Sequence, residues 1–385
     1  MPGRLIPLAD PRRQYAELKA EIDEVIGAVV DRGIFTPDEQ VGALESEFAG
    51  WLGSPYAVGV ASGSSALTLA LRSVGVGPGD EVVITANLDI SVVGPITQVG
   101  AQPRFVDIEG GTQTMAPEAL AHGLGARTGA VVVVHCHGHV AALRAILEEA
   151  ATHGIPVIED ATLAPGAWYE DRRVGSFGTI GCFSFAPTKP LGAFGNAGMV
   201  VTSSEEIARR VRTLANYGFR EDSIAAIRSG RPGATFRYTE PGINATMDEL
   251  QAAVVRIKLR RIDEWAGRRR SYAATYRRAL QDSEDRVVLP VEREGGRSAP
   301  RFFVARIPRR DQVAEMLFAD GIRTAMNYVP PMHVQPPYGH PGRIGTLPVT
   351  ERISDELLCL PLAPELGAGE IEYSASRLVH ALGAG

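Results

Sequence analysis

Short apolar segments alternate with helical segments through the first half of the chain, and this alternation limits the possible folds most strongly. Helical stretches such as Ala141–Thr152 separate the apolar segments. The apolar segments are continuous and rich in Val and Ile: Tyr56–Ala61, Glu81–Thr85, Phe105–Ile108, Ala130–His135 and Pro156–Glu159. Strands of this kind are buried on both faces, as in parallel sheets whose connections are helices. The pattern predicts an α/β fold with a mostly parallel sheet.

The segments outside this core predict how the chain is divided. Two amphipathic helices, Tyr15–Val30 and Val41–Leu52, precede the first strand, and two more strands, Cys182–Ser184 and Met199–Thr202, flank a Gly-rich loop. An Arg-rich helical stretch, Met247–Leu280, leads into a tail with its own strand and helix signals. We therefore expect a large domain at residues 1–250 and a smaller one at 251–385.

Charge and composition exclude several classes of protein. The formal charge is −6, which disfavours binding to nucleic-acid backbones because that binding needs clustered Lys and Arg. The three cysteines are far apart and show no CxxC spacing, which favours a reducing cytoplasm over a disulfide framework. The sequence shows no apolar run of membrane-spanning length and no signal peptide, so we expect no membrane association and a cytoplasmic location.

One group of small polar residues follows the first predicted strand. Ser62-Gly63-Ser64-Ser65 lies between that strand and a predicted helix. A helix N-terminus presents unpaired N–H groups, Gly63 allows a close backbone approach, and the serines add donors, so the motif can hold a phosphate. Plain helix capping by serine is the more ordinary interpretation.

Two further groups sit at the ends of predicted strands. Asp160 ends the run that begins at Pro156, where a carboxylate can pair with a protonated ring nitrogen, although helix capping is again the commoner role. Lys189 follows Ser184 and enters a Gly-rich loop, where burial and nearby cations can keep an amine neutral; a solvated lysine is the ordinary alternative. Taken together, an anion cradle, an acid and a lysine match the phosphate, the ring nitrogen and the aldehyde of pyridoxal phosphate.

Motifs in a fixed order along nearly the whole chain then identify a family. The sequence resembles the sugar aminotransferases of the DegT/DnrJ/StrS family, which have pyridoxal-phosphate fold type I. The segments that carry the resemblance are Ala57–Leu67 (AVGVASGSSAL), Gly77–Val82 (GPGDEV), Phe105–Ile108 (FVDI), Val157–Ala161 (VIEDA), Gly181–Lys189 (GCFSFAPTK), Met247–Ala253 (MDELQAA), Pro330–Pro336 (PPMHVQP) and Leu347–Glu351 (LPVTE). The resemblance implies a seven-stranded, mostly parallel sheet with a smaller C-terminal α/β domain.

The resemblance also implies roles for single residues. Lys189 matches the lysine that carries the cofactor and shuttles the proton, and Asp160 matches the acid at the pyridine nitrogen. Phosphate contacts are implied at Gly63, Ser64, Ser65 and Ser184. Asn244 matches an asparagine that reaches the phosphate from a partner subunit, which implies a homodimer with shared active sites. His333, within the motif Pro330–Pro336, is a candidate substrate contact.

Two departures from the family pattern affect the expected site. Asp89 occupies the position of an aromatic residue that stacks on the cofactor ring, and we include it among the cofactor contacts as a possible hydrogen-bonding group. Leu163 and Pro165 replace a Gln and a His that often follow the acid. Lys189 itself is intact, which argues against the family's dehydratase branch, where histidine replaces it.

Two other signals carry weaker hypotheses. The run His135-Cys136-His137-Gly138-His139 has metal-binding residue types, but its spacing is not that of a zinc site, so we predict no metal. Arg228 and Arg231 belong to a cluster of arginines between residues 209 and 237. Guanidinium groups suit a diphosphate, so these two are candidates for holding a nucleotide-linked sugar.

The predicted activity is amino transfer in amino-sugar or secondary-metabolite (antibiotic) biosynthesis. By resemblance, the donor is L-glutamate and the acceptor a nucleotide-diphosphate 4-keto-6-deoxyhexose or a 3-keto relative. An aminotransferase acting on a keto-cyclitol is one alternative. A catalytically idle family member that serves as a partner protein is the other, and the replacements at Asp89 and Leu163 keep it open.

Overall fold

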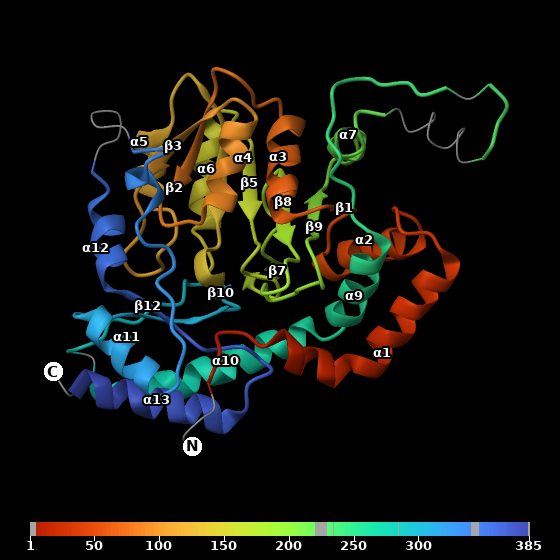
Figure 1. Cartoon of the computed structure of the whole chain (residues 1–385). Coiled ribbons are helices and arrows are strands. Elements are labelled where there is room, and N and C mark those ends of the chain that lie inside the picture. The colour runs from red at the N-terminus through yellow and green to blue at the C-terminus, as the bar shows by residue number, and fades with distance from the viewer. Residues whose placement is uncertain (1–4, 220–228, 234, 284, 340–345, 384–385) are drawn as a thin grey trace.

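The computed structural model describes residues 5–219, 229–233, 235–283, 285–339 and 346–383 (Figure 1). Its centre is a seven-stranded sheet in the order β1-β9-β8-β5-β4-β2-β3. Only β9 among these strands runs antiparallel to its neighbours, so the predicted mostly parallel seven-stranded sheet is confirmed. The strands are β1 Tyr56–Val60, β2 Glu81–Thr85, β3 Gln102–Val106, β4 Thr128–Val134, β5 Val157–Asp160, β8 Ile180–Ser184 and β9 Gly198–Thr202.

The two faces of the sheet bury different helices, because successive side chains of a strand point to opposite faces. On β4, Val131 and Val133 join a core formed with α2, α5, α6 and α9, while Val132 and Val134 join a core formed with α3, α4 and α7. These strands therefore read as continuous apolar runs in the sequence. The helices are α1 Pro11–Arg32, α2 Glu39–Leu52, α3 Gly63–Ser73, α4 Ile90–Gln98, α5 Pro117–Gly123, α6 Leu143–Thr152, α7 Glu205–Ala215 and α9 Glu249–Leu259.

The helical stretch predicted at Met247–Leu280 is two helices rather than one. α9 ends at Leu259 and α10 runs over Ile262–Ala279. α9 is buried against α1 and α2, whereas α10 continues into the C-terminal part of the chain and packs on α13. The chain changes direction between the two helices because each belongs to a different core. No Gly or Pro marks the break, so the sequence pattern did not reveal it.

The C-terminal part has a separate apolar core around a two-stranded antiparallel sheet. The ring of Tyr276 on α10 stacks on that of Phe303 with centroids 4.4 Å apart. The proposed domain division at residue 250 stays a proposal. Elements of the C-terminal part are β11 Phe303–Arg306, α11 Arg310–Ala319, α12 Pro348–Glu356, β12 Leu357–Leu360 and α13 Ala368–Gly383. A small sheet joins β10 Gly296–Arg297 to β6 Trp168–Tyr169 and β7 Arg172–Arg173, and three short 3-10 turns are η1 Cys136–Gly138, η2 Gln281–Ser283 and η3 Met332–Val334.

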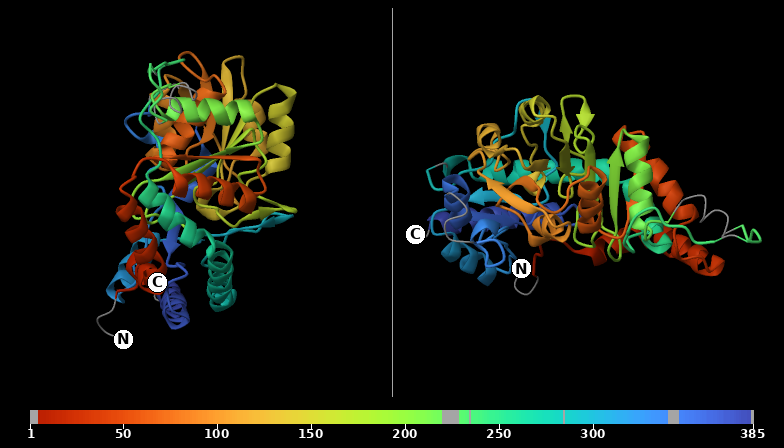
Figure 2. Two further views of the ribbon diagram at one scale, coloured as in Figure 1. Left: turned by 90° about the vertical axis from the view of Figure 1, so that its right-hand side faces the viewer. Right: turned by 90° about the horizontal axis from the view of Figure 1, so that it is seen from above.

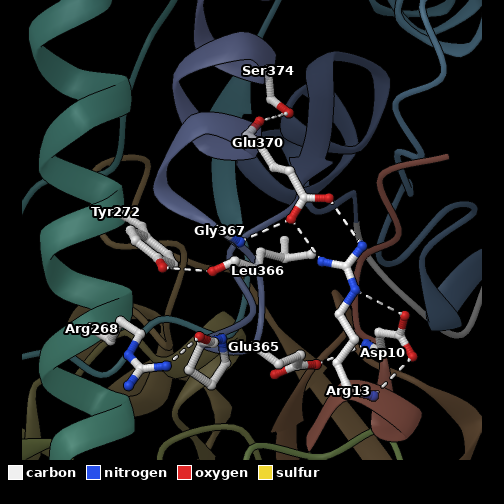
Figure 3. A network of polar contacts seen from close by, with 10 residues as sticks. Asp10, Arg13, Arg268, Tyr272, Glu365, Leu366, Gly367, Glu370 and Ser374 are labelled. Carbon is white, nitrogen blue, oxygen red and sulfur yellow. Dashed lines mark hydrogen bonds and ion pairs between the residues drawn. The ribbon is translucent and has the colours of Figure 1, made fainter. Parts of the chain in front are cut away.

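The N-terminal segment is tied to the C-terminal helices by polar contacts. Arg13 makes a two-pronged ion pair with Glu370 of α13, with nitrogen–oxygen distances of 2.7 and 3.0 Å (Figure 3). The backbone N–H of Asp10 donates to Glu365 at 2.7 Å, and Asp10 itself caps α1. Seen from above, α1 and α2 lie at the opposite end of the molecule from the C-terminal helices (Figure 2). Within the described ranges, every helix is too short or too polar to traverse a lipid bilayer.

Asp107, just after β3, joins the main sheet to α12. Its carboxylate accepts hydrogen bonds from the backbone N–H groups of Val349 and Thr350 and from the Thr350 hydroxyl, at 2.7–2.9 Å. Burial opposes ionisation of this carboxyl, but these bonds outweigh burial and hold its pKa below the usual value. The FVDI and LPVTE motifs therefore meet at one joint between the two parts of the chain.

Glu159 of β5 and His135, just after β4, form a buried polar pair. The Glu159 carboxylate is fully buried and accepts the N–H groups of Gly175, Phe177 and Gly178 at 2.6–2.7 Å. It also lies 3.1 Å from His135 Nε2. Burial raises the pKa of Glu159, but its bonds to His135 and the backbone outweigh burial and leave the pKa lowered.

We predict that Glu159→Gln destabilises the fold by about 2–4 kcal/mol near neutral pH. The NH₂ group of the glutamine amide would point at backbone N–H groups that now donate to the carboxylate, and the site is buried. The folded-state pKa is depressed, so this stabilisation is present above the unfolded value of 4.5 and disappears as pH falls through the lower folded value. Urea unfolding from neutral to acidic pH measures it. The exposed Glu148→Gln is the control, expected within about 0.5 kcal/mol of the parent. Equal stabilities of the two variants at neutral pH would contradict the prediction.

Candidate active site

The three groups singled out in the sequence lie at one edge of the sheet. Ser62 follows β1, Asp160 ends β5 and Ser184 ends β8. β9 is antiparallel to both β1 and β8, so β1, β5 and β8 point the same way and their carboxyl ends share an edge. Ligands of open α/β sheets bind outside that edge.

Gly63 and Ser184 form the floor of a cradle at the start of α3. A Cβ placed on Gly63 would lie 2.6 Å from Ser184 Cβ and 3.0 Å from Ser184 Oγ, so the two backbones approach as closely as glycine allows. Ser62 Oγ accepts the Ser65 N–H at 3.0 Å and caps the helix, as the ordinary interpretation predicted. Ser64 Oγ donates to Ser91 O at 2.9 Å. The other N–H groups at the start of α3, together with Ser184, can bind an anion.

We predict that Gly63→Ala weakens binding of pyridoxal phosphate about 10- to 100-fold, because the added methyl group displaces the Ser184 side chain from the cradle. Titration of the cofactor-free protein, followed by visible absorption, measures this. Gly42→Ala in α2 is the matched control, since its Cβ would meet no atom within 4 Å. Equal affinities in the two variants would show that the cradle is not the phosphate site.

Asp160 and Glu159 are neighbours in sequence but point to opposite faces of β5. Asp160 is 3% exposed and its Oδ1 accepts the Thr162 N–H at 2.9 Å, while no described residue donates to Oδ2. Asp160 therefore keeps an acceptor oxygen at the open edge of the sheet. Glu159 instead makes hydrogen bonds inside the core.

Lys189 lies in the hairpin loop between β8 and β9 and is half-buried. Burial, and then the nearby positive charge of Arg301, lower the pKa of its amine, while the carboxylates of Asp160 and Asp89 act in the opposite direction. Lys189 and Arg301 also line the same cavity. A lysine with a lowered pKa has more of the neutral amine that nucleophilic chemistry needs.

The residues at the departures from the family pattern have local structural roles. Asp89 caps α4 by accepting the Ser91 N–H at 2.8 Å, and its charge still acts on Lys189. Leu163 and Pro165 are both buried. The Leu163 carbonyl lies against Gly138, where an added Cβ would come within 2.9 Å of it.

The predicted substrate and partner residues that the structure describes are Asn244, Arg231 and His333. Asn244 is exposed and pairs through its backbone with Asn216, next to Ala245, whose carbonyl accepts the Ala61 N–H at 2.8 Å beyond the end of β1. Arg231 is exposed in the long excursion between α7 and α9 (Figure 1). Arg228 lies outside the described residues. His333 is buried in η3 with Nε2 3.1 Å from Glu351 Oε1, which gives it a structural partner.

The structure adds two residues that sequence reasoning missed, and both come from segments without a strand-end signal. Arg301 lies just before β11, and its charge acts on Lys189 and on Tyr328. The ring of Tyr328 stacks on that of His137, a member of the histidine-rich run singled out in the sequence, with centroids 6.1 Å apart and planes 10° from parallel. No group of His, Cys, Asp and Glu in the described part of the chain is arranged to hold a metal ion.

The match to a known family covers this whole arrangement. The model described as the DegT/DnrJ/EryC1/StrS aminotransferase family matches residues 16–379. The chain belongs to this aminotransferase family. Its similarity to the sugar aminotransferases is therefore confirmed, and with it the transaminase activity and the dependence on pyridoxal phosphate.

Relatives extend the match over nearly the full length. A dTDP-3-amino-3,4,6-trideoxy-alpha-D-glucose transaminase of Streptomyces venezuelae is 37% identical over 362 residues, which are 94% of this chain and 92% of the relative. A UDP-N-acetyl-3-dehydro-alpha-D-glucosamine 3-aminotransferase of Acidithiobacillus ferrooxidans is 36% identical, over 96% of both chains. The crystal structure of S. venezuelae DesV in complex with a ketimine intermediate superposes with a TM-score of 0.90 at 36% identity, over 98% of both chains.

The site of this DegT/DnrJ/EryC1/StrS family member fits the cofactor. Because Gly63 has no Cβ, Ser184 can lie directly against the start of α3, where its hydroxyl and the helix N–H groups can bind a phosphate, and Asp160 keeps an acceptor oxygen at the sheet edge. Lys189 presents an amine whose charge acts on that of Asp160. The roles of the individual residues stay predictions.

Proposed function

We propose that this aminotransferase moves an amino group from L-glutamate to the keto group of a nucleotide-diphosphate sugar. The observation that carries the proposal is the placement of Lys189, Asp160 and the Gly63–Ser184 cradle at one sheet edge in a chain whose relatives are named for nucleotide sugars. The relatives' names both put the new amino group at carbon 3. We therefore place a 3-keto sugar first, ahead of the 4-keto-6-deoxyhexose that sequence alone favoured.

Each residue of the cluster has a distinct task in this proposal. Ser64, Ser65, Ser184 and the N–H groups at the start of α3 bind the phosphate, and Asp160 holds a proton on the ring nitrogen. Bound in this way, pyridoxal phosphate supplies an electron sink for the carbon that loses its proton. Lys189 carries the cofactor and moves that proton in both half-reactions, because its lowered pKa suits an amine that must both accept and donate near neutral pH.

We also propose a homodimer in which Asn244 reaches the partner's site. Asn244 is exposed in the single chain although it lies one residue from the segment that pairs with β1. Exposed aromatic rings gather nearby: Phe236 and Tyr238, 63% and 59% exposed, both pack on the ring of Phe219. Light scattering of the purified protein measures the assembly, and a monomer at working concentration would remove this part of the proposal.

A spectroscopic experiment tests the function in two steps. Glutamate added to the purified protein should remove the visible absorption of the lysine-bound cofactor, which establishes the first half-reaction. A nucleotide-diphosphate 3-keto sugar should then restore the absorption. Restoration by the 4-keto sugar alone would assign the amination to carbon 4 instead of carbon 3. Restoration by a keto-cyclitol alone would favour the cyclitol alternative. Failure to bind pyridoxal phosphate at all would favour the idle-partner alternative.

A further inference from the structure

A second cavity, the α10 cavity, lies between one face of α10 and the chain around β11. It encloses about 210 Å³, and none of the described residues lines both it and the cavity beside Lys189. Residues 270, 273, 274 and 277 line it, and their helical spacing places them on one face of α10. The rest of its lining comes from His139 and from residues between 290 and 304. The α10 cavity is therefore a candidate site distinct from the one around Lys189.

Two polar side chains of this cavity have unused hydrogen-bonding capacity. His139 is 8% exposed, and its Nδ1 has no partner among the described residues. Arg270 is half-buried, and its Nη1 is fully buried and equally without a partner there. The carboxylate of Glu292, in contrast, already accepts the Ser298 N–H at 3.0 Å and the Ser298 hydroxyl at 2.6 Å. Buried polar atoms without partners are costly, so native sites seldom leave them unused.

The charges of the lining favour an added anion. Burial lowers the pKa of Arg270 and of Arg277, and the carboxylate of Glu292 offsets only part of this effect. Burial, and then the charge of Arg277, lower the pKa of His139 to about 4, so its ring is neutral near pH 7 and can donate one N–H. A carboxylate in the cavity would stabilise both guanidinium charges, and its two oxygens match the donor fork of an arginine.

The remaining lining is apolar and selects the body of the ligand. Pro300, Phe302 and Phe303 are buried residues of the wall, and Ala273 and Ala274 of α10 add methyl groups. A dry cavity of about 150 Å³ holds benzene. The 210 Å³ of the α10 cavity therefore has room for a body of that size and one carboxylate. Sugar hydroxyls or a second charge would be left without partners against these walls. The cavity matches a monocarboxylate with a compact apolar body.

One segment of chain joins the α10 cavity to the active site. Pro300 and Phe302 line the α10 cavity, whereas Arg301 between them lines the cavity of Lys189. The backbone N–H of Arg301 also donates to the His137 carbonyl at 2.8 Å, in the histidine-rich run. A molecule in the α10 cavity would contact the residues on either side of Arg301, so its binding should act on the cavity of Lys189.

We propose that the α10 cavity binds a monocarboxylate with a compact apolar body, held by Arg270 and His139, and that its occupancy is coupled to the cofactor site at Lys189. None of its lining residues belongs to the proposed catalytic cluster. The proposal therefore does not depend on which donor or acceptor the enzyme uses. Benzoate and 4-methylpentanoate represent the aromatic and the branched aliphatic forms of such a ligand.

Calorimetry on the full-length, cofactor-loaded protein tests the binding. For benzoate we expect a Kd on the order of 0.1–1 mM, as suits a ligand of this size. A comparison with 4-methylpentanoate distinguishes the aromatic from the aliphatic source. Acetate lacks the apolar body and benzyl alcohol lacks the charge, so each should bind at least about tenfold more weakly than benzoate.

Two variants and a matched control locate the binding. Arg270→Gln removes the charge and should weaken benzoate binding about 10- to 30-fold. Ala274→Leu fills the cavity and should weaken it by at least about tenfold. Arg278→Gln removes an exposed arginine of the same helix whose Nη2 bonds Thr275, and it should leave the Kd within about twofold.

A further variant distinguishes the α10 cavity from the cavity of Lys189, which Arg301 lines and which a carboxylate can also enter. Arg301→Gln should keep benzoate binding within about threefold, because its side chain lies in the other cavity. A loss in Arg301→Gln with none in Arg270→Gln or Ala274→Leu would assign benzoate to the cavity of Lys189 and overturn the proposal. The absence of binding by both acids at about ten times the expected Kd would also overturn it.

The coupling to the cofactor site is measured by comparing two forms of the protein. Because coupling between two sites is reciprocal, the Kd of benzoate should differ about two- to fivefold between the cofactor-free and the cofactor-loaded protein. Saturating benzoate should change the Kd of pyridoxal phosphate by the same factor, and Ala274→Leu should abolish this effect. Equal Kd values for benzoate in the two forms would overturn the coupling.

Discussion

Replacement of Lys189 by alanine should reduce turnover about 10⁴-fold or more, because the chain loses both the amine that carries the cofactor and the group that moves the proton. The purified variant should also lack the visible band of the lysine-bound cofactor. Lys189 lies in the loop after β8 at the sheet edge, and burial lowers its pKa. Absorption spectra and single-turnover rates with glutamate measure the two effects.

Controls for this variant are available in the same chain. Lys19→Ala, at an exposed lysine paired with Asp23, should keep full activity. Added methylamine should restore part of the activity of Lys189→Ala, since the cavity that is left can admit a small amine. Turnover within tenfold of wild type would mean that another lysine carries the cofactor. Lys258, buried with a pKa lowered to about 8 by burial, would then be the next residue to change.

Asp160→Asn should lower kcat by about 100- to 1,000-fold, because the amide no longer holds a proton on the ring nitrogen by charge. The change is nearly isosteric, and the side-chain oxygen can still accept the Thr162 N–H. The melting temperature should therefore stay within about 2 °C. Stopped-flow measurement of the glutamate half-reaction, together with thermal unfolding, separates the two effects. A kcat within threefold of wild type would remove Asp160 from the proposed chemistry.

The main sheet could be predicted from sequence because its signals are local. The strands β2, β4 and β5 are continuous Val- and Ile-rich runs, and small or polar residues such as Ser62 or Asp160 stand at carboxyl ends of the sheet. The family pattern supplied the total of seven strands. The break between α9 and α10 was not predictable, because it depends on which core each helix joins rather than on a breaker residue.

The site was predictable only where its residues follow strands. Lys189, Asp160 and Gly63 all do. Arg301 and Tyr328 do not: Arg301 lines the same cavity as Lys189, and its charge acts on Tyr328. The metal-like run at His135 also shows the limit of local reasoning. His135 bonds Glu159 in the core, while His137 stacks on Tyr328.

The antiparallel strand β9 has a consequence for how the site can move. Because β8 and β9 form a hairpin, the loop that holds Lys189 is closed at both ends, by Phe185 N–H to Ala197 O at 2.7 Å and Ala193 N–H to Phe185 O at 2.7 Å. Lys189, Asp160 and Ser184 thus all belong to the main sheet or to its closed loop. Arg301 and Tyr328 belong to the C-terminal part of the chain. A shift of the C-terminal part at the Asp107 joint would therefore move Arg301 and Tyr328 relative to Lys189 and leave the three sheet-edge residues together.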